Sequence, residues 1–323
     1  MKLTNSLCPE CYEVIPATIT EFNSEMWMTK TCPSHGLFHT MVERSAFWWH
    51  ICNELDCKNI YDGYLIDVTD RCNIKCKYCY NGNLGKDIGI DEIIKDAEKY
   101  KYLAPFVLVG GEPTVHPSLP KLYKELIQIA DTVLLTNGIK LCDDEYFDEL
   151  CEAGLLVGDT LNMGLSFHKE SNGKDIELVE KCRERKVRIG TTLWVIDELS
   201  QIDDAISVYQ KYFDVIGNMR IKAASNLGCE NGADNKIFTS DIIWYLAKIG
   251  KIELITSRFN KVSFANILFN GLFIMPVSWY DVNNVDLDDI SCPPYYRAKD
   301  GNLYNFVTAE LINAGINKNS KNQ

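Results

Sequence analysis

Three cysteines offer the clearest chemistry in this sequence: Cys72, Cys76 and Cys79. They stand in one short segment that directly follows an apolar run, Tyr64–Val68. Thiolates spaced this closely are soft, charged ligands suited to an iron–sulfur cluster. Structural zinc sites and cubane clusters take four ligands, yet the next cysteine along the chain is Cys142. The pattern therefore predicts a cluster that keeps one iron open to a ligand from outside the protein.

A second motif, Gly110-Gly111-Glu112-Pro113, follows the next apolar run, Phe106–Val109. Glycine lets the backbone approach a ligand closely, and Glu112 supplies a negative charge that suits an ammonium group. Alone, such a segment is usually no more than a turn. Its position after the cysteine motif, again behind a strand-like run, makes the pair a specific signal.

Together the two motifs resemble those of the radical S-adenosylmethionine (SAM) enzymes, over about residues 62–225. The resemblance implies that the three cysteines hold a [4Fe–4S] cluster whose open iron chelates SAM. It implies that residues 110–113 cradle the methionine amino group. Reduction would then cleave SAM to a 5′-deoxyadenosyl radical, which abstracts hydrogen from a substrate. An electron donor such as flavodoxin or ferredoxin would be a partner.

Weaker candidates follow from the same resemblance. Tyr78 matches an aromatic position that packs near the adenine, and Asn137 and Ser166 match polar positions that contact the carboxylate and ribose of SAM. His168 stands where many relatives carry an aspartate, so it is a candidate for the cofactor site or for a substrate acid or base. The plainer alternatives are a turn residue at Asn137 and a hydrogen-bonded histidine at 168.

Residues 1–60 predict a separate metal-bound β module, because two knuckle-like cysteine motifs flank strand-like runs. So short a segment buries little surface, and a mononuclear iron or zinc would supply much of its folding energy. Six residues are candidate ligands: Cys8, Cys11, Cys32, His35, Cys52 and Cys57. The spacing favours His35 as the fourth ligand. A resemblance to the rubredoxin-like opening of radical SAM enzymes that act on lipid chains or pterins favours Cys52 or Cys57, which are otherwise core cysteines.

From residue 61 the pattern alternates between strands and helices, which predicts a parallel α/β sheet. The expected strands are Tyr64–Val68, Phe106–Val109, Val133–Thr136, Leu161–Phe167, Val187–Val195 and Val215–Ile221. The expected helices are Asp91–Tyr102, Leu119–Ala130, Asp143–Ala153, Gly173–Arg185 and Asp203–Tyr212. Six repeats predict an incomplete α/β barrel, a partial (βα)6 fold over residues 61–225. Its chemistry belongs at the carboxyl ends of the strands, where both motifs fall.

Residues 226–323 form an extension in which this alternation stops and aromatic residues gather. We expect residues 260–310 to close the open side of the barrel, because a radical in open water would be quenched. Tyr295, Tyr296 and Arg297 are the candidates to face the substrate, with Arg297 able to hold a carboxylate or phosphate. Outward packing of these aromatics is the alternative. The polar stretch Asn313–Gln323 is expected to fray.

Composition limits the remaining functions. The chain has 323 residues and a net charge of −12, which argues against nucleic-acid binding, since phosphate contacts need clustered Lys and Arg. The sequence predicts no membrane span and no signal peptide, and hence a cytoplasmic protein, where thirteen cysteines favour metal ligation over disulfides.

The leading hypothesis is a radical SAM enzyme that acts on a small molecule or an apolar chain. A peptide-modifying maturase is an alternative, although such enzymes usually carry a run of C-terminal cysteines and residues 268–323 contain only Cys292. A non-enzymatic iron–sulfur or zinc protein for electron transfer is the other. It predicts no SAM binding at residues 110–113.

Overall fold

The computed structural model describes residues 1–54, 63–79, 81, 85–225, 236–255, 264–288, 295–297 and 301–321. The chain divides into two compact units. The first comprises Met1–Tyr61, Ile196–Leu199 and Ile221–Gln323, and the second comprises Asp62–Val195 and Ser200–Arg220. The boundary passes through strand β11 (Met219–Ala223), so this strand belongs to both units.

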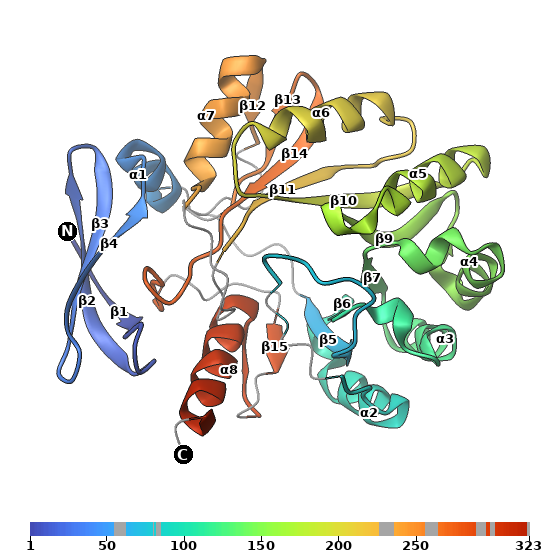
Figure 1. Ribbon diagram of the computed structural model, residues 1–323, viewed down its shortest axis with the longest axis horizontal. Helices are drawn as coiled ribbons and strands as arrows, with labels where there is room; N and C mark the ends of the chain where they lie inside the picture. The colour runs from blue at the N-terminus through green and yellow to red at the C-terminus, as the bar shows by residue number, and fades with distance from the viewer. Residues whose placement is uncertain are drawn as a thin grey trace. The chain divides into compact units, whose positions relative to one another are not determined.

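The second unit is built on a parallel sheet. Its strands, in spatial order, are β10 (Arg188–Ile196), β9 (Thr160–Phe167), β7 (Thr132–Thr136), β6 (Phe106–Gly110) and β5 (Tyr64–Thr69). The connecting helices are α2 (Ile90–Tyr100), α3 (Leu119–Ile129), α4 (Asp144–Leu150), α5 (Lys174–Glu184) and α6 (Gln201–Lys211). In Figure 1 these helices lie along one side of the strands. The predicted α/β class is confirmed, and closure into a partial barrel stays a prediction.

Shorter elements complete this unit. They are the 3₁₀ turns η1 (Lys101–Leu103), η2 (Pro113–Val115), η3 (Ile139–Cys142) and η5 (Lys169–Ser171), the π-helical turn η4 (Cys151–Leu155) and strand β8 (Leu156–Val157). Strand β8 runs antiparallel to β9, so the turn between them folds back on the sheet.

The two faces of the sheet differ in burial. On β9, Leu161, Met163 and Leu165 are fully buried, whereas Asn162 and Ser166 on the opposite face are partly exposed. Because successive side chains of a strand alternate between faces, the helices must cover the first set. We call the face that carries Asn162 and Ser166 the inner face. Side chains on this face can contact a ligand.

The pairing of β10 with β9 shifts register at Gly190, and Gly217, just before β11, lies against this glycine. Ile189 pairs with Leu161 on the helix-covered face, but Thr191 pairs with Gly164 on the inner face. A Cβ on Gly217 would lie 2.6 Å from the carbonyl oxygen of Gly190, closer than atoms tolerate. The irregularity therefore depends on glycine, as register shifts commonly do.

The first unit begins with an antiparallel sheet of β1 (Lys2–Leu7), β2 (Val14–Phe22), β3 (Glu25–Cys32) and β4 (Gly36–Glu43). Asn23 and Ser24 both have positive φ, 51° and 62°, as the tight turn of a two-residue hairpin requires. Strand β1 was missed from the sequence, because Lys2–Leu7 has a mixed polar pattern and gains its partners only from β2.

The remainder of this unit contains α1 (Ala46–Glu54), α7 (Thr239–Ile249), β12 (Ile252–Leu254), β13 (Ile267–Phe269), β14 (Leu272–Val277), β15 (Tyr295–Arg297), β16 (Leu303–Asn305) and α8 (Phe306–Lys321). Strands β13 and β14 form a hairpin whose turn, Asn270-Gly271, has positive φ at both residues. The expectation that the C-terminal stretch frays was wrong up to Lys321, because α8 continues through it. No helix in the described part of the chain is both long and apolar enough to cross a bilayer.

The N-terminal sheet and the C-terminal segments share buried polar contacts. Lys30 is only 2% exposed, and its ammonium donates to Ser6 Oγ at 3.0 Å and to the carbonyls of Leu7 at 2.6 Å and Val282 at 3.0 Å. A buried ammonium left without acceptors would be costly, so these bonds tie the two segments together.

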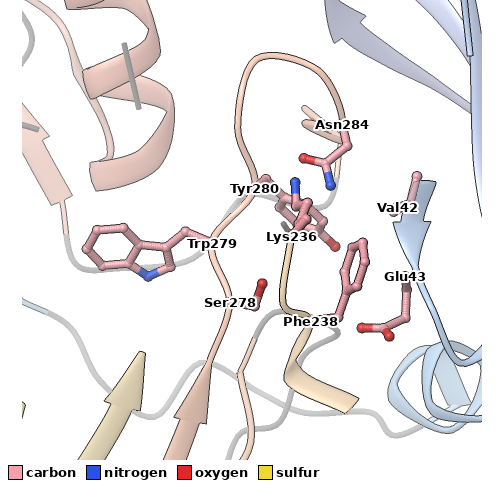
Figure 2. Close-up of a pocket in the computed structure, with 8 residues that line it drawn as sticks. All are labelled: Val42, Glu43, Lys236, Phe238, Ser278, Trp279, Tyr280 and Asn284. Carbon is pink, nitrogen blue, oxygen red and sulfur yellow. The ribbon is translucent and has the colours of Figure 1, made fainter. Parts of the chain in front are cut away.

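A small pocket lies between β4 and these segments (Figure 2). Glu43 lines it, is 1% exposed and accepts hydrogen bonds from Ser240 Oγ and from the backbone N–H of Ser45 at 3.1 Å. Lys236 donates to Asp281 at 2.9 Å, and Ser278 Oγ donates to the Ile237 carbonyl. Because these polar groups bond to one another, they stabilise the packing of this unit around the pocket.

Replacing Glu43 by Gln should remove a pH dependence of stability. Burial raises the pKa of Glu43 from 4.5 to about 7. The folded state therefore holds a proton that the unfolded state releases, and the free energy of unfolding should fall by roughly 3 kcal/mol as pH rises from 4.5 to 7. Urea unfolding of the metal-loaded protein at several pH values measures this fall. An equally steep fall in the variant would show that another group is responsible.

Candidate active site and metal centre

The three cysteines of the central motif lie in the loop after β5, and all three are partly buried. Burial raises the pKa of Cys76 to about 12, and the charges of Glu170, Cys79, Cys72 and Glu112 add to it. Burial likewise raises the pKa of Cys72. The three thiols and the Gly-Gly-Glu loop share one region, because the Glu112 N–H bonds to the carbonyl of Arg71, the residue before Cys72. Three soft donors on one loop fit an iron–sulfur cluster, and each must lose a proton to bind iron.

Gly110 and Gly111 press the second motif against the cysteine loop. The Gly111 N–H donates to the Thr69 carbonyl at 2.7 Å, and the Glu112 N–H donates to the Arg71 carbonyl at 2.9 Å. A Cβ on Gly110 would lie 2.4 Å from the Thr69 oxygen, and one on Gly111 would lie 2.2 Å from the Arg71 oxygen. The glycines therefore permit an approach of backbone to backbone, which joins the two motifs into one site.

Glu112 is the buried centre of this site, with an exposed fraction of 2%. Its Oε1 accepts from Thr114 N at 3.0 Å, Thr114 Oγ at 2.6 Å and Thr136 Oγ at 2.6 Å, while Oε2 accepts from Asn137 N at 2.7 Å. Burial raises the pKa of Glu112, and these hydrogen bonds oppose the rise. Sequence reasoning missed this network, which locks the ends of β6 and β7 together. Oε2 keeps an acceptor position for a further donor.

Asn137 joins the third strand end to the cysteine loop. Its Nδ2 donates to Asn73 Oδ1 at 2.7 Å, and its Oδ1 accepts from the Ile139 N–H at 3.1 Å. Gly138 follows with φ of +75°, in the left-handed region that glycine adopts freely. Asn137 is thus a turn residue that also contacts the cysteine loop, and its predicted contact with SAM stays a prediction.

His168 lies against the cysteine loop. Its Nδ1 is 3.4 Å from Cys76 Sγ, and its backbone N–H donates to Asp175 Oδ2 at 3.3 Å. Cys76, His168 and Glu170 offer ligand atoms within 4.8 Å of one another. Glu170, which sequence reasoning missed, also accepts from the Lys77 N–H at 3.4 Å. Glu170 could have been found from the sequence, because a carboxylate two residues after a candidate histidine can be a further ligand or hydrogen-bond partner at the same site.

The other predicted contacts are less defined. Ser166 lies on the inner face at the end of β9, and Tyr78 is partly buried beneath the Lys77 ammonium, which is 4.7 Å from its ring centre. Pro113 is buried at the first position of η2. The roles of these residues toward SAM stay predictions.

Residues of the extension are described only in part. Tyr296 is buried, with its ring edge-on to Phe306 at 5.9 Å, and Arg297 is exposed. The side chain of Tyr295 and residues Cys57 and Cys292 lie outside the described part of the chain. Closure of the active site by residues 260–310 stays a prediction.

The N-terminal sheet brings four donors together. Cys8, Cys11, Cys32 and His35 offer ligand atoms that all lie within 4.8 Å of one another. His35 Nδ1 is 3.7 Å from Cys8 Sγ and 3.4 Å from Cys32 Sγ, and the sulfurs of Cys11 and Cys32 are 3.9 Å apart. Cys52 is buried on α1 and is not part of this group. Three thiols and one imidazole form a donor set that suits zinc.

We expect loss of His35 to weaken this metal centre while loss of Cys52 leaves it intact. The His35→Ala variant removes one of four donors, and its metal affinity should fall by at least about tenfold. Cys52→Ala is the control, because this thiol is buried elsewhere. Competition with a chromogenic chelator measures both affinities. Equal loss in the two variants would remove His35 as the preferred fourth ligand.

Each of the two candidate sites lies in a segment that matches a known protein family. Residues 66–206 match the Radical SAM superfamily, and residues 1–44 match the HMPTM N-terminal zinc ribbon domain. The chain is 32% identical over 194 residues to a 7,8-dihydro-6-hydroxymethylpterin dimethyltransferase of Methanocaldococcus jannaschii. This alignment covers 48% of this chain and 37% of that protein. It is 33% identical over 143 residues to a probable GTP 3′,8-cyclase of Methanococcus maripaludis, which covers 40% of this chain and 46% of that protein.

The chain thus spans about half the length of these curated relatives or less. Among solved structures, Streptococcus suis SuiB bound to S-adenosylmethionine superposes with a TM-score of 0.47 and 15% identity, over 62% of this chain and 49% of that chain. This likeness is too distant to bear on the substrate.

Proposed function

We propose that this chain is an enzyme that reductively cleaves SAM, because residues 66–206 match the Radical SAM superfamily and residues 1–44 match the HMPTM N-terminal zinc ribbon domain. Cys72, Cys76 and Cys79 would hold a [4Fe–4S] cluster. When bound, the cluster and SAM supply the radical chemistry that removes hydrogen from the substrate. The observation that carries the proposal is the bonding of the Gly-Gly-Glu loop to the backbone of the cysteine loop.

The residues around the cluster would position SAM. Glu112 is buried and forms no ion pair with any described residue, so its carboxylate suits the ammonium of the methionine end. Asn137 Nδ2 already reaches the cysteine loop and would order it around the cofactor. His168 is held 3.4 Å from Cys76 and would support the cluster and not the ribose. The zinc ribbon would hold zinc through Cys8, Cys11, Cys32 and His35.

For the substrate we propose a small heterocyclic molecule of the pterin or purine class. Two separate matches support this class, because the zinc ribbon carries the HMPTM name and the radical SAM region resembles enzymes named for a pterin and for GTP. No observation on the described residues favours an apolar chain or a peptide. An electron donor of the flavodoxin or ferredoxin kind would supply the electron.

Anaerobic reconstitution tests the proposal. Protein loaded with iron, sulfide and zinc is reduced with dithionite in the presence of SAM, and 5′-deoxyadenosine is measured by mass spectrometry. We expect its formation without added substrate and a faster rate with the correct heterocycle. Full cluster loading without 5′-deoxyadenosine, or without any SAM binding at equilibrium, would instead support a non-enzymatic electron-transfer protein.

A further inference from the structure

Arg220 on β11 carries a buried group without a partner. Its Nε is shielded from solvent and has no hydrogen-bond acceptor. Four other described arginines pair with an acid: Arg44 with Asp241, Arg71 with Asp87, Arg183 with Asp214 and Arg185 with Asp144. Arg220 differs from these four because its shielded Nε has no acceptor.

The register of the sheet places this side chain on the inner face. Ile189 pairs with Ile216 on the helix-covered face, and the Thr192 N–H donates to the Asn218 carbonyl, which sets Asn218 beside Thr191. Two residues further along the ladder, Arg220 falls beside Leu193, which pairs with Ser166. Arg220 therefore lies on the partly exposed face, at the level of Ser166, which stands one residue before the end of β9.

An unpaired guanidinium in such a place is costly. Arginine stays charged at all ordinary pH values, and a shielded N–H that lacks an acceptor destabilises the folded state. Burial lowers the pKa of Arg220, and no neighbouring acid offsets this among the described residues. Groups with pKa values shifted by burial cluster at functional sites.

We propose that Arg220 binds an oxyanion of the substrate, a carboxylate or phosphate, through the fork of its guanidinium. This rests on the proposed function. SAM also carries a carboxylate, but the residues predicted to hold SAM lie after β6 and β7 and, at Ser166, on β9, which is two strand positions from β11. Strand β11 is four strand positions from β6, and each spacing is about 4.8 Å. A substrate lying across the inner face would reach from the cluster to Arg220.

The test uses the protein with both metal centres loaded and SAM bound, under anaerobic conditions. Inorganic pyrophosphate and malonate serve as probes and are titrated by calorimetry. The unaltered protein should bind at least one of them at a single site. Arg220→Gln should weaken that binding by about tenfold or more, because a charge-assisted bidentate contact is lost. Arg183→Gln, which removes a surface arginine bonded to Asp214, should bind within about twofold of the unaltered protein.

Three results would overturn the proposal. In the first, neither probe binds the unaltered protein. In the second, Arg220→Gln binds both probes as tightly as the unaltered protein does. In the third, Arg220→Gln weakens the binding of SAM but not of the probes, which would assign the oxyanion to SAM. If the Arg220→Gln variant does not fold, Arg220→Lys takes its place in the test. Unchanged affinity of the Lys variant for the probes would contradict a bidentate contact by the guanidinium. The proposed function has its own test, because it fails if the unaltered enzyme forms no 5′-deoxyadenosine. Binding of the probes needs no turnover, so the two failures can be told apart.

Discussion

Replacement of Cys76 by Ala is expected to abolish both the cluster and the cleavage of SAM. With only three thiols in the motif, loss of one leaves two ligands, too few to hold a cubane with one open iron. Cys76 is also the thiol that contacts His168, so its loss removes one of the contacts between the cysteine loop and the residues after β9. Iron and sulfide content, the cluster absorbance and 5′-deoxyadenosine formation should all fall to background.

Cys151→Ala provides the matched control for this experiment. Cys151 is also a partly buried free thiol, but it lies in the π-helical turn after α4. Its replacement should leave iron content and SAM cleavage close to those of the unaltered protein. A Cys76→Ala variant that still formed 5′-deoxyadenosine at the control's rate would contradict the assignment of the cluster.

The second large effect is expected from Gly111→Ala. The added methyl group would lie 2.2 Å from the Arg71 carbonyl oxygen and 2.8 Å from that of Asp70, so the backbone must move. The bonds that join the two loops would then break. We expect a loss of roughly 3–5 kcal/mol in the free energy of unfolding and no SAM cleavage. Urea unfolding and the 5′-deoxyadenosine assay measure the two effects.

Gly89→Ala shows whether any added methyl group near the site has this effect. Gly89 precedes α2 with an ordinary φ of −63°, and nothing lies within 4 Å of the position of its Cβ. Stability and SAM cleavage should therefore stay nearly unchanged in that variant. Wild-type cleavage by Gly111→Ala would show that the contact between the loops can be dispensed with.

Local patterns in the sequence were enough to locate the strands and helices of the second unit. Tyr64–Val68 became β5, and the helix expected at Asp203–Tyr212 became α6, each within two residues of the predicted start. Apolar periodicity reports which side of an element is buried, and here each element is buried against its neighbours in the sheet. The strand expected from Val215 begins only at Met219. Before it, Ile216 makes a single bridge to Ile189, and Gly217 packs closely against Gly190.

The rest of the site depends on contacts between distant residues, which no local pattern reveals. Glu112 was predicted as a charge for SAM, but its hydrogen bonds to Thr136 and Asn137 arise only once β6 and β7 are neighbours. The contact of His168 with Cys76 joins positions 92 residues apart. Arg220 resembles any strand arginine until the sheet shows which face it occupies.

The glycines at 190 and 217 have a consequence for how the length of this segment can vary. In this part of the sheet the side chains exchange faces at the register shift, so the number of residues from Ile216 to Arg220 decides which face the guanidinium occupies. One residue added or removed within β10 or at the start of β11 would reverse that choice for every later position of the strand. Changes of length in this stretch are therefore confined to the turn between β10 and α6 and to α6 itself, and within the strands only changes by pairs of residues would keep Arg220 on the inner face.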